Sequence, residues 1–126
     1  VPAMIAEFAT HDGGLKIPTT LVALEDDELI GSVSLLDNDH DDIRAYSPWL
    51  ASLYVRPDQR GRGLGIDLVR RCEDMAHRLG VERLYLYTSG REPFYRKLGW
   101  QDVATVNLRG VCATVMGIAP RALAAA

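Results

Sequence analysis

The sequence of 126 residues has only two cysteines, no apolar run long enough to cross a bilayer and no net basic charge. Cys72 and Cys112 form no C-x-x-C pair, and each lies in an apolar pattern. We therefore expect two reduced core cysteines in a cytoplasmic protein that does not insert into a membrane. The first residues lack a basic region followed by an apolar core, so the sequence predicts no secretory signal.

The polar residues disfavour two classes of binding protein, those with a calcium loop and those that bind nucleic acid. The run Asp37 to Asp42 contains alternating acids, but Asp42 stands where a calcium loop needs glycine, and Pro48 stands where it needs a bidentate glutamate. No metal site is predicted. A formal net charge of −3 and the absence of a basic stripe with interleaved aromatics argue against nucleic-acid binding.

The composition that is present is typical of one globular domain over residues 1–126. Hydrophobic residues make up 48% and charged residues 25%, and no internal repeat or linker occurs. The charge is uneven, because residues 1–55 have a net charge of −8 and residues 56–126 a net charge of +5. This asymmetry suits a phosphorylated cofactor on one side and a cationic substrate on the other, and segregation of solvated charges by chance explains it equally well.

Apolar periodicity predicts an α/β domain in which strands and helices alternate around the centre. Residues 1–18 have little periodicity, and we expect a loop or a short helix remnant there. The strands on either side of the long helix should pair in parallel, with antiparallel additions at the ends. The expected elements are a hairpin over 19–36, a strand over 49–55, a helix over 64–79, a strand over 83–88, a short helix ending at 98 and a hairpin over 100–118.

The segment Arg60-Gly61-Arg62-Gly63-Leu64-Gly65 joins the predicted 49–55 strand to the long helix. Glycines allow a backbone to wrap an anion, a helix N-terminus favours negative charge, and arginines stay charged near neutral pH. The segment therefore predicts a phosphate site, with a plain turn as the alternative. A dinucleotide-binding fingerprint needs glycine or alanine at Ile66, and a P-loop needs lysine there, so neither motif fits.

Val55 to Gly65, with its core Arg60-x-x-Gly63-x-Gly65, resembles the acyl-CoA signature of the GNAT superfamily of acetyl-CoA-dependent N-acetyltransferases. Pro93 to Trp100 resembles the second family motif, a short helix with a tyrosine that ends in Lys-x-Gly-aromatic. The resemblance implies a mixed, mostly antiparallel twisted sheet with helices on both faces and a splayed central parallel strand pair. It also implies another strand and helix before the first hairpin, and residues 1–18 are too short for both, so we expect an abbreviated or trimmed N-terminus.

The resemblance further implies acetyl-CoA as co-substrate and assigns roles to residues of this sequence. Tyr95 corresponds to the proton donor for the departing thiolate, a role that suits a group titrating near 10. Thr88 stands where many relatives have asparagine and is expected to contact the cofactor, while Arg91 stands where a small residue is frequent. The implied cofactor-binding residues are Leu53, Tyr54 and Val55 beside the pantetheine, with one N–H on the thioester carbonyl, and Arg60, Gly61, Arg62, Gly63, Leu64 and Gly65 at the pyrophosphate.

The activity that the resemblance implies is transfer of an acetyl group to a primary amine of a small molecule or a protein by direct attack in a ternary complex. The alternative is a non-catalytic domain that binds or senses acyl-CoA, since such a domain would also contain the glycine loop, residues 60–65. No general base is assigned: the candidates are His40 and its neighbouring carboxylates, or a water held near Ser52 and Tyr87. Strand edges of this architecture often pair, which allows a homodimer that no particular residue indicates.

Overall fold

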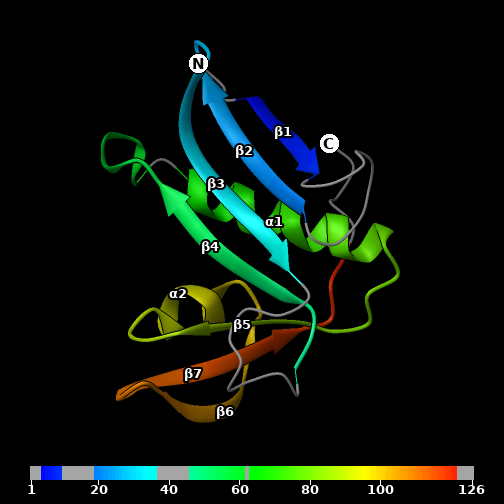
Figure 1. Cartoon of the computed structure of the whole chain (residues 1–126), viewed down its shortest axis with the longest axis vertical. Coiled ribbons are helices and arrows are strands. Elements are labelled where there is room, and N and C mark those ends of the chain that lie inside the picture. Colours follow the sequence, from blue (N-terminus) through cyan, green and yellow to red (C-terminus); the bar gives the residue numbers. More distant parts are fainter. Residues whose placement is uncertain (1–3, 10–18, 37–45, 62, 122–126) are drawn as a thin grey trace.

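The computed structural model describes residues 4–9, 19–36, 46–61 and 63–121 (Figure 1). It confirms the predicted alternation of strands and helices, with boundaries within two residues of those expected. The elements are β1 (Met4–Ala9), β2 (Thr19–Glu25), β3 (Glu28–Leu36), β4 (Trp49–Val55), the 3₁₀ turn η2 (Pro57–Gln59), α1 (Leu64–Arg78), β5 (Leu84–Thr88), α2 (Glu92–Lys97), β6 (Gln101–Leu108) and β7 (Val111–Ile118).

All described strands join one sheet in the order β1-β2-β3-β4-β5-β7-β6. Every neighbouring pair is antiparallel except β4 and β5, which are parallel because α1 carries the chain back between them. The predicted mixed, mostly antiparallel sheet is therefore confirmed.

The parallel pair is splayed. The only pair in register between β4 and β5 is Trp49 and Tyr85, near the start of both strands. The Tyr85 N–H also donates to the Pro48 carbonyl at 3.0 Å. Beyond that point the two strands diverge, as Figure 1 shows. The predicted splayed centre is present, and it leaves one side of β4 without a strand partner from residue 50 onward.

The β2–β3 hairpin is closed by Asp26 and Asp27, both with positive φ. A bulge follows, since the register jumps between Ala23 and Leu24 opposite Gly31. A Cβ on Gly31 would lie 2.9 Å from the Tyr54 carbonyl oxygen, so this glycine permits close packing of β3 against β4 and α1. The bulge near Gly31 that the sequence predicts is confirmed.

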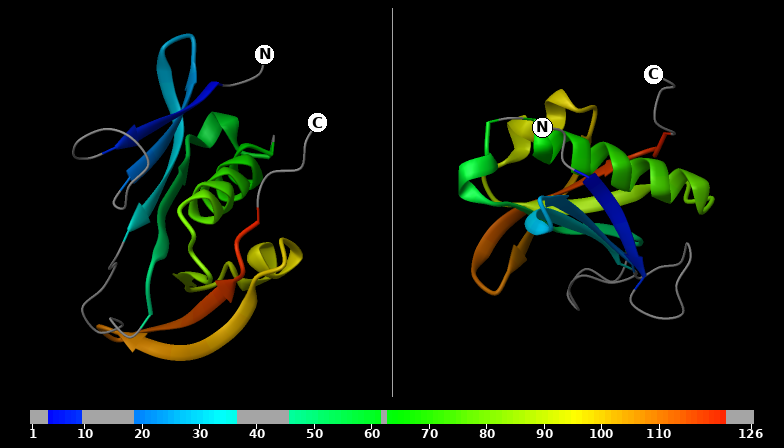
Figure 2. Two further views of the ribbon diagram at one scale, coloured as in Figure 1. Left: turned by 90° about the vertical axis from the view of Figure 1, so that its right-hand side faces the viewer. Right: turned by 90° about the horizontal axis from the view of Figure 1, so that it is seen from above.

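The sheet has a different cover on each face. The larger core cluster lies between the sheet and α1, which buries Leu68, Val69, Cys72 and Met75, and it extends to Tyr95 of α2. A smaller cluster around Trp49 and Val115 lies on the opposite face, where tyrosines pack over it. Figure 2 shows both described helices on the same side of the sheet, whereas the resemblance implies helices on both faces. Aromatic side chains replace a helix over the second face in the described residues.

Two expectations from the sequence are wrong. Residues 4–9 form a strand, β1, which pairs antiparallel with β2 from Met4↔Leu24 to Ala9↔Thr19, instead of a loop or helix remnant. Pairing at a sheet edge depends on a distant partner, and local periodicity does not report it. Cys112 is exposed and only Cys72 is buried, because β7 continues past the core into the hairpin.

No described helix is both long enough and apolar enough to span a membrane. Residues 37–45, which hold His40 and the acidic run, lie outside the described part of the chain, as does Arg62.

Candidate active site

A cleft of about 590 Å³ opens where β4, η2, the start of α1 and the start of α2 meet. It collects segments that are far apart in the sequence, and it includes most of the residues implied by the GNAT resemblance. The lining residues are Leu53, Tyr54, Val55, Gln59, Arg60, Gly61, Gly63, Leu64, Gly65, Ile66, Arg91, Phe94 and Tyr95.

The glycine loop forms the mouth of this cleft. Gly63 is the N-cap of α1 with φ 84°, and as a glycine it offers no side chain to cap the helix. The first residues of α1, Leu64 to Ile66, line the cleft, so the positive end of the helix dipole lies there. Apart from its chain neighbours, a Cβ on Gly61 or Gly63 would have no heavy atom of the described residues within 4 Å, so space beside the amides of these glycines is open for a ligand. The loop fits a phosphate group.

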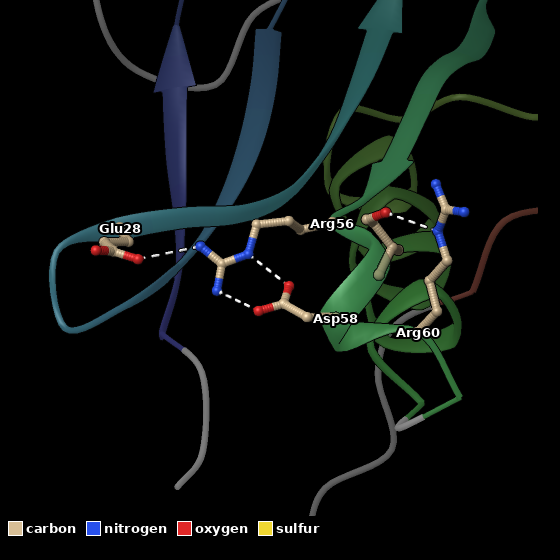
Figure 3. Close-up of polar contacts among 5 residues, drawn as sticks. Glu28, Arg56, Asp58 and Arg60 are labelled. Carbon is tan, nitrogen blue, oxygen red and sulfur yellow. Dashed lines mark hydrogen bonds and ion pairs between the residues drawn. The ribbon is translucent and has the colours of Figure 1, made fainter.

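The two arginines that flank η2 have different surroundings (Figure 3). Arg56 donates to both carboxylate oxygens of Asp58, at 2.6 and 2.9 Å, and to Glu28 at 3.1 Å. These bonds raise the pKa of the Arg56 guanidinium and tie the β2–β3 turn to the loop. Arg60 points away from this group, and its Nε donates to the Val55 carbonyl at 3.0 Å. Arg60 lines the cleft and, among the described residues, forms no ion pair with a carboxylate.

β4 has a bulge in the middle of the cleft wall. Its register with β3 passes from Ser32↔Tyr54 to Ser34↔Ala51, so β4 has one residue more than β3 across this interval. Ser52 has φ 55°, an uncommon conformation for a residue other than glycine. Leu53 lies in this bulge, outside the regular register of β4 with β3, and it lines the cleft.

Tyr95 lies where this cleft meets a second one. The second cleft, of about 350 Å³, is lined by Leu50, Ala51, Ser52, Leu53, Leu86, Tyr87 and Tyr95 and lies in the gap between β4 and β5. Of the described residues, only Leu53 and Tyr95 line both clefts. Tyr95 is 8% exposed, and burial raises its pKa while the Arg91 charge opposes the rise. Its hydroxyl therefore stays protonated across the neutral range.

The buried Glu73 carboxylate is linked to Tyr95 through Trp100. The Tyr95 ring packs edge-on against Trp100, with centroids 6.2 Å apart. The Trp100 indole N–H donates to Glu73 Oε2 at 3.2 Å, and Arg70 donates to Glu73 at 2.9 Å. Glu73 is only 2% exposed, and burial raises the pKa of its carboxyl even though Arg70 and Trp100 favour the charged form.

This burial predicts a specific pH dependence of stability. Because the Glu73 pKa is higher in the folded than in the unfolded chain, its stabilising contribution is complete below the unfolded pKa and is lost as pH rises through the folded pKa. Glu73→Gln does not titrate. We therefore expect the free energy of unfolding of the unmodified chain, minus that of Glu73→Gln, to increase as pH is lowered from 7 to 4, measured by urea unfolding.

The matched control for this prediction is Glu82→Gln, because Glu82 is exposed before β5. Its difference from the unmodified chain should change much less over the same pH range. A Glu73→Gln difference that stays flat, or that shrinks toward pH 4, would contradict a raised Glu73 pKa.

Thr88 is hydrogen-bonded to the start of α2. Thr88 lines neither cleft, and its hydroxyl accepts the Arg91 N–H at 3.3 Å. The position of Thr88 therefore does not support the expected contact with the cofactor. The N-cap of α2 is Arg91, and Pro93 lies in the first turn. Glu92 accepts from the Gly90 N–H at 2.9 Å and from the Thr114 hydroxyl at 2.8 Å, which fixes α2 to β7.

Four residues that line the larger cleft are not predicted as site residues from the sequence: Gln59, Ile66, Arg91 and Phe94. The sequence does mark Arg91 as unusual, because this arginine stands where the family pattern usually has a small residue. Ile66 is a large apolar residue that is 43% exposed, which only the structure reveals. Gln59 is buried under the loop, and Phe94 contacts the position of a Cβ on Gly65 at 3.8 Å.

Residues 4–100 match the model of the Acetyltransferase (GNAT) family. The chain belongs to the GNAT acetyltransferase family. The sequence-based resemblance is thus confirmed for the family and the fold. No curated protein matches the chain.

Solved structures of acetyltransferases share this fold. yncA from Salmonella typhimurium, a candidate acetyltransferase solved with its cofactor acetyl-CoA, is 25% identical, with a TM-score of 0.67 over 87% of this chain and 69% of that one. A GNAT family acetyltransferase from Elizabethkingia anophelis with acetyl-CoA bound is 12% identical, with a TM-score of 0.68 over 93% and 97%. Arabidopsis thaliana Naa50, in complex with a bisubstrate analogue CoA-Ac-MVNAL, is 19% identical, with a TM-score of 0.63 over 79% and 72%.

Metal ligands do not gather in the described part of the chain. Among these residues, no group of three or more His, Cys, Asp or Glu side chains is arranged to hold a metal ion.

Proposed function

We propose that this GNAT protein is an N-acetyltransferase that moves an acetyl group from acetyl-CoA to a primary amine of a small molecule or a protein. The attack is direct, with both substrates bound together. The observation that carries the proposal is the meeting of two clefts at Leu53 and Tyr95, because acetyl transfer needs a donor and an acceptor that converge on one pair of polar groups.

The larger cleft suits the acyl-CoA. Its phosphates would lie on the amides of the glycine loop and the start of α1, beside the Arg60 charge. The pantetheine arm contains amide groups, and it would run along Leu53, Tyr54 and Val55, beside the edge of β4 that β5 leaves unpaired. These residues would orient the arm with its thioester toward Tyr95.

Each reacting group would have a partner at the junction. The amine nitrogen forms a bond to the thioester carbon, and the carbon–sulfur bond breaks. The Leu53 backbone N–H, at the β4 bulge, would stabilise the carbonyl oxygen as it gains negative charge. Tyr95 would give its phenolic proton to the departing sulfur, and the amine must lose a proton before or during attack. No described residue is assigned as the base.

The acceptor would enter through the smaller cleft, whose described lining contains no charged side chain. Its polar groups there are the hydroxyls of Ser52, Tyr87 and Tyr95. The amine would therefore be neutral at the moment of attack. Its carrier would be a small molecule, or the end or a side chain of a protein.

The test is calorimetric titration with acetyl-CoA, with NAD as a negative control, followed by a thiol-release assay with a panel of primary amines. We expect saturable binding of acetyl-CoA, no binding of NAD, and amine-dependent release of CoA. Binding without release for any amine class would favour a non-catalytic acyl-CoA-binding domain. A folded sample that binds no acetyl-CoA would overturn the proposed function.

A further inference from the structure

Arg91 is a cation on the α2 wall of the larger cleft, opposite the glycine loop. Its guanidinium carbon lies 5.9 Å from the centroid of the Phe94 ring, a cation–π distance that restrains an otherwise exposed side chain. The same Phe94 ring reaches to 3.8 Å from where a Cβ on Gly65 would lie. One aromatic ring therefore separates the Arg91 charge from the N-terminal turn of α1.

The backbone of Arg91 is fixed independently of its side chain. Its N–H donates to Thr88 Oγ1 at 3.3 Å, and its carbonyl accepts the N–H groups of Phe94 at 3.1 Å and Tyr95 at 3.4 Å. A change of side chain leaves these bonds available. The start of α2 thus fixes the backbone of Arg91, and the contact with Phe94 restrains its guanidinium.

Arg91 differs in its charge partners from four other described arginines. Arg56, Arg70, Arg78 and Arg96 each form an ion pair with a carboxylate. In the ranges that the structure describes, Arg91 forms none, and neither does Arg60 across the cleft. Two uncompensated cations face one cleft whose other wall is a helix N-terminus, an arrangement that favours an anionic ligand with more than one phosphate.

We propose that Arg91 binds a phosphate group of the acyl-CoA from the α2 side, as a counterpart of Arg60 and the glycine loop. This inference rests on the proposed function and names a ligand contact at a position where the family pattern usually has a small residue. Acyl-CoA offers two sources of phosphate, the diphosphate bridge and the 3′-phosphate. Arg91 is a binding residue in this proposal, not a participant in acetyl transfer.

The experiment compares Arg91→Leu with the unmodified chain by calorimetric titration with acetyl-CoA and with acetyl-3′-dephospho-CoA. Leucine keeps an apolar stem against Phe94 and removes the charge. We expect acetyl-CoA to bind roughly tenfold more weakly, with a shallower dependence of affinity on salt concentration. Arg91→Lys should recover part of the affinity. Arg71→Leu is the matched control, because Arg71 is exposed on α1 and lines neither cleft.

The two ligands separate the sources of phosphate. An equal loss for both ligands supports a contact with the diphosphate, and a loss confined to acetyl-CoA supports a contact with the 3′-phosphate. Affinities of folded Arg91→Leu that equal those of the unmodified chain for both ligands would overturn the inference and leave the proposed function standing. If the unmodified chain binds neither ligand, the proposed function itself fails, and the inference fails with it.

Discussion

Tyr95→Phe should lower the turnover of acetyl transfer about 100-fold or more, while the affinity for acetyl-CoA stays within about threefold. The substitution removes one hydroxyl and keeps the ring that packs against Phe94 and Trp100. The departing sulfur would then lose its proton donor, whereas the phosphate and pantetheine contacts would remain. Steady-state kinetics with an accepted amine, together with calorimetric binding of acetyl-CoA, measures the two quantities separately.

The matched control is Tyr85→Phe. Tyr85 is half-buried against Trp49 on the other face of the sheet and lines neither cleft, so its loss of a hydroxyl should leave turnover nearly unchanged. The pH profile offers a second measure. Burial raises the Tyr95 pKa, so activity that depends on the protonated hydroxyl should not decline on the alkaline side until above the usual tyrosine range. Unchanged turnover in Tyr95→Phe would remove this residue from the mechanism.

Gly63→Ala should weaken acetyl-CoA binding by roughly 10- to 100-fold. Apart from the chain neighbours, an added Cβ meets no heavy atom of the described residues within 4 Å, so it would project into space that a phosphate needs in order to reach the amides of the loop. The loss of one hydrogen bond to a charged group costs about 1.5 to 3 kcal/mol, which corresponds to that range of affinity. Calorimetric titration measures the effect.

Gly80→Ala separates this loss from backbone strain. Gly80 follows α1 with φ 78°, close to the 84° of Gly63, and a Cβ there also has no heavy atom within 4 Å. Both variants should lose about 1 to 2 kcal/mol of stability, because an L-residue is strained in the left-handed region. Only Gly63→Ala should lose affinity. Equal affinities for the two variants would mean that the loop is a turn and not a phosphate site.

The sequence by itself determined the elements whose signals are local. The apolar spacing from Leu64 to Leu79 predicts α1 because every third or fourth residue returns to the same helix face. The alternation of strands around that helix predicts the parallel pair, and the glycine loop and the Tyr95 motif identify the family. Most of the residues so implied do line one cleft.

Tertiary structure alone decided the features that depend on distant partners. The pairing of β1 with β2, the exposure of Cys112 and the burial of Glu73 beneath Trp100 each need a contact between segments that no local pattern links. The same holds for the convergence of Arg91 and Phe94 on the glycine loop. The smaller cleft lies in the gap where β4 splays from β5, and its meeting with the larger cleft at Leu53 and Tyr95 depends on the bulge, the sheet order and α2 being fixed together in space.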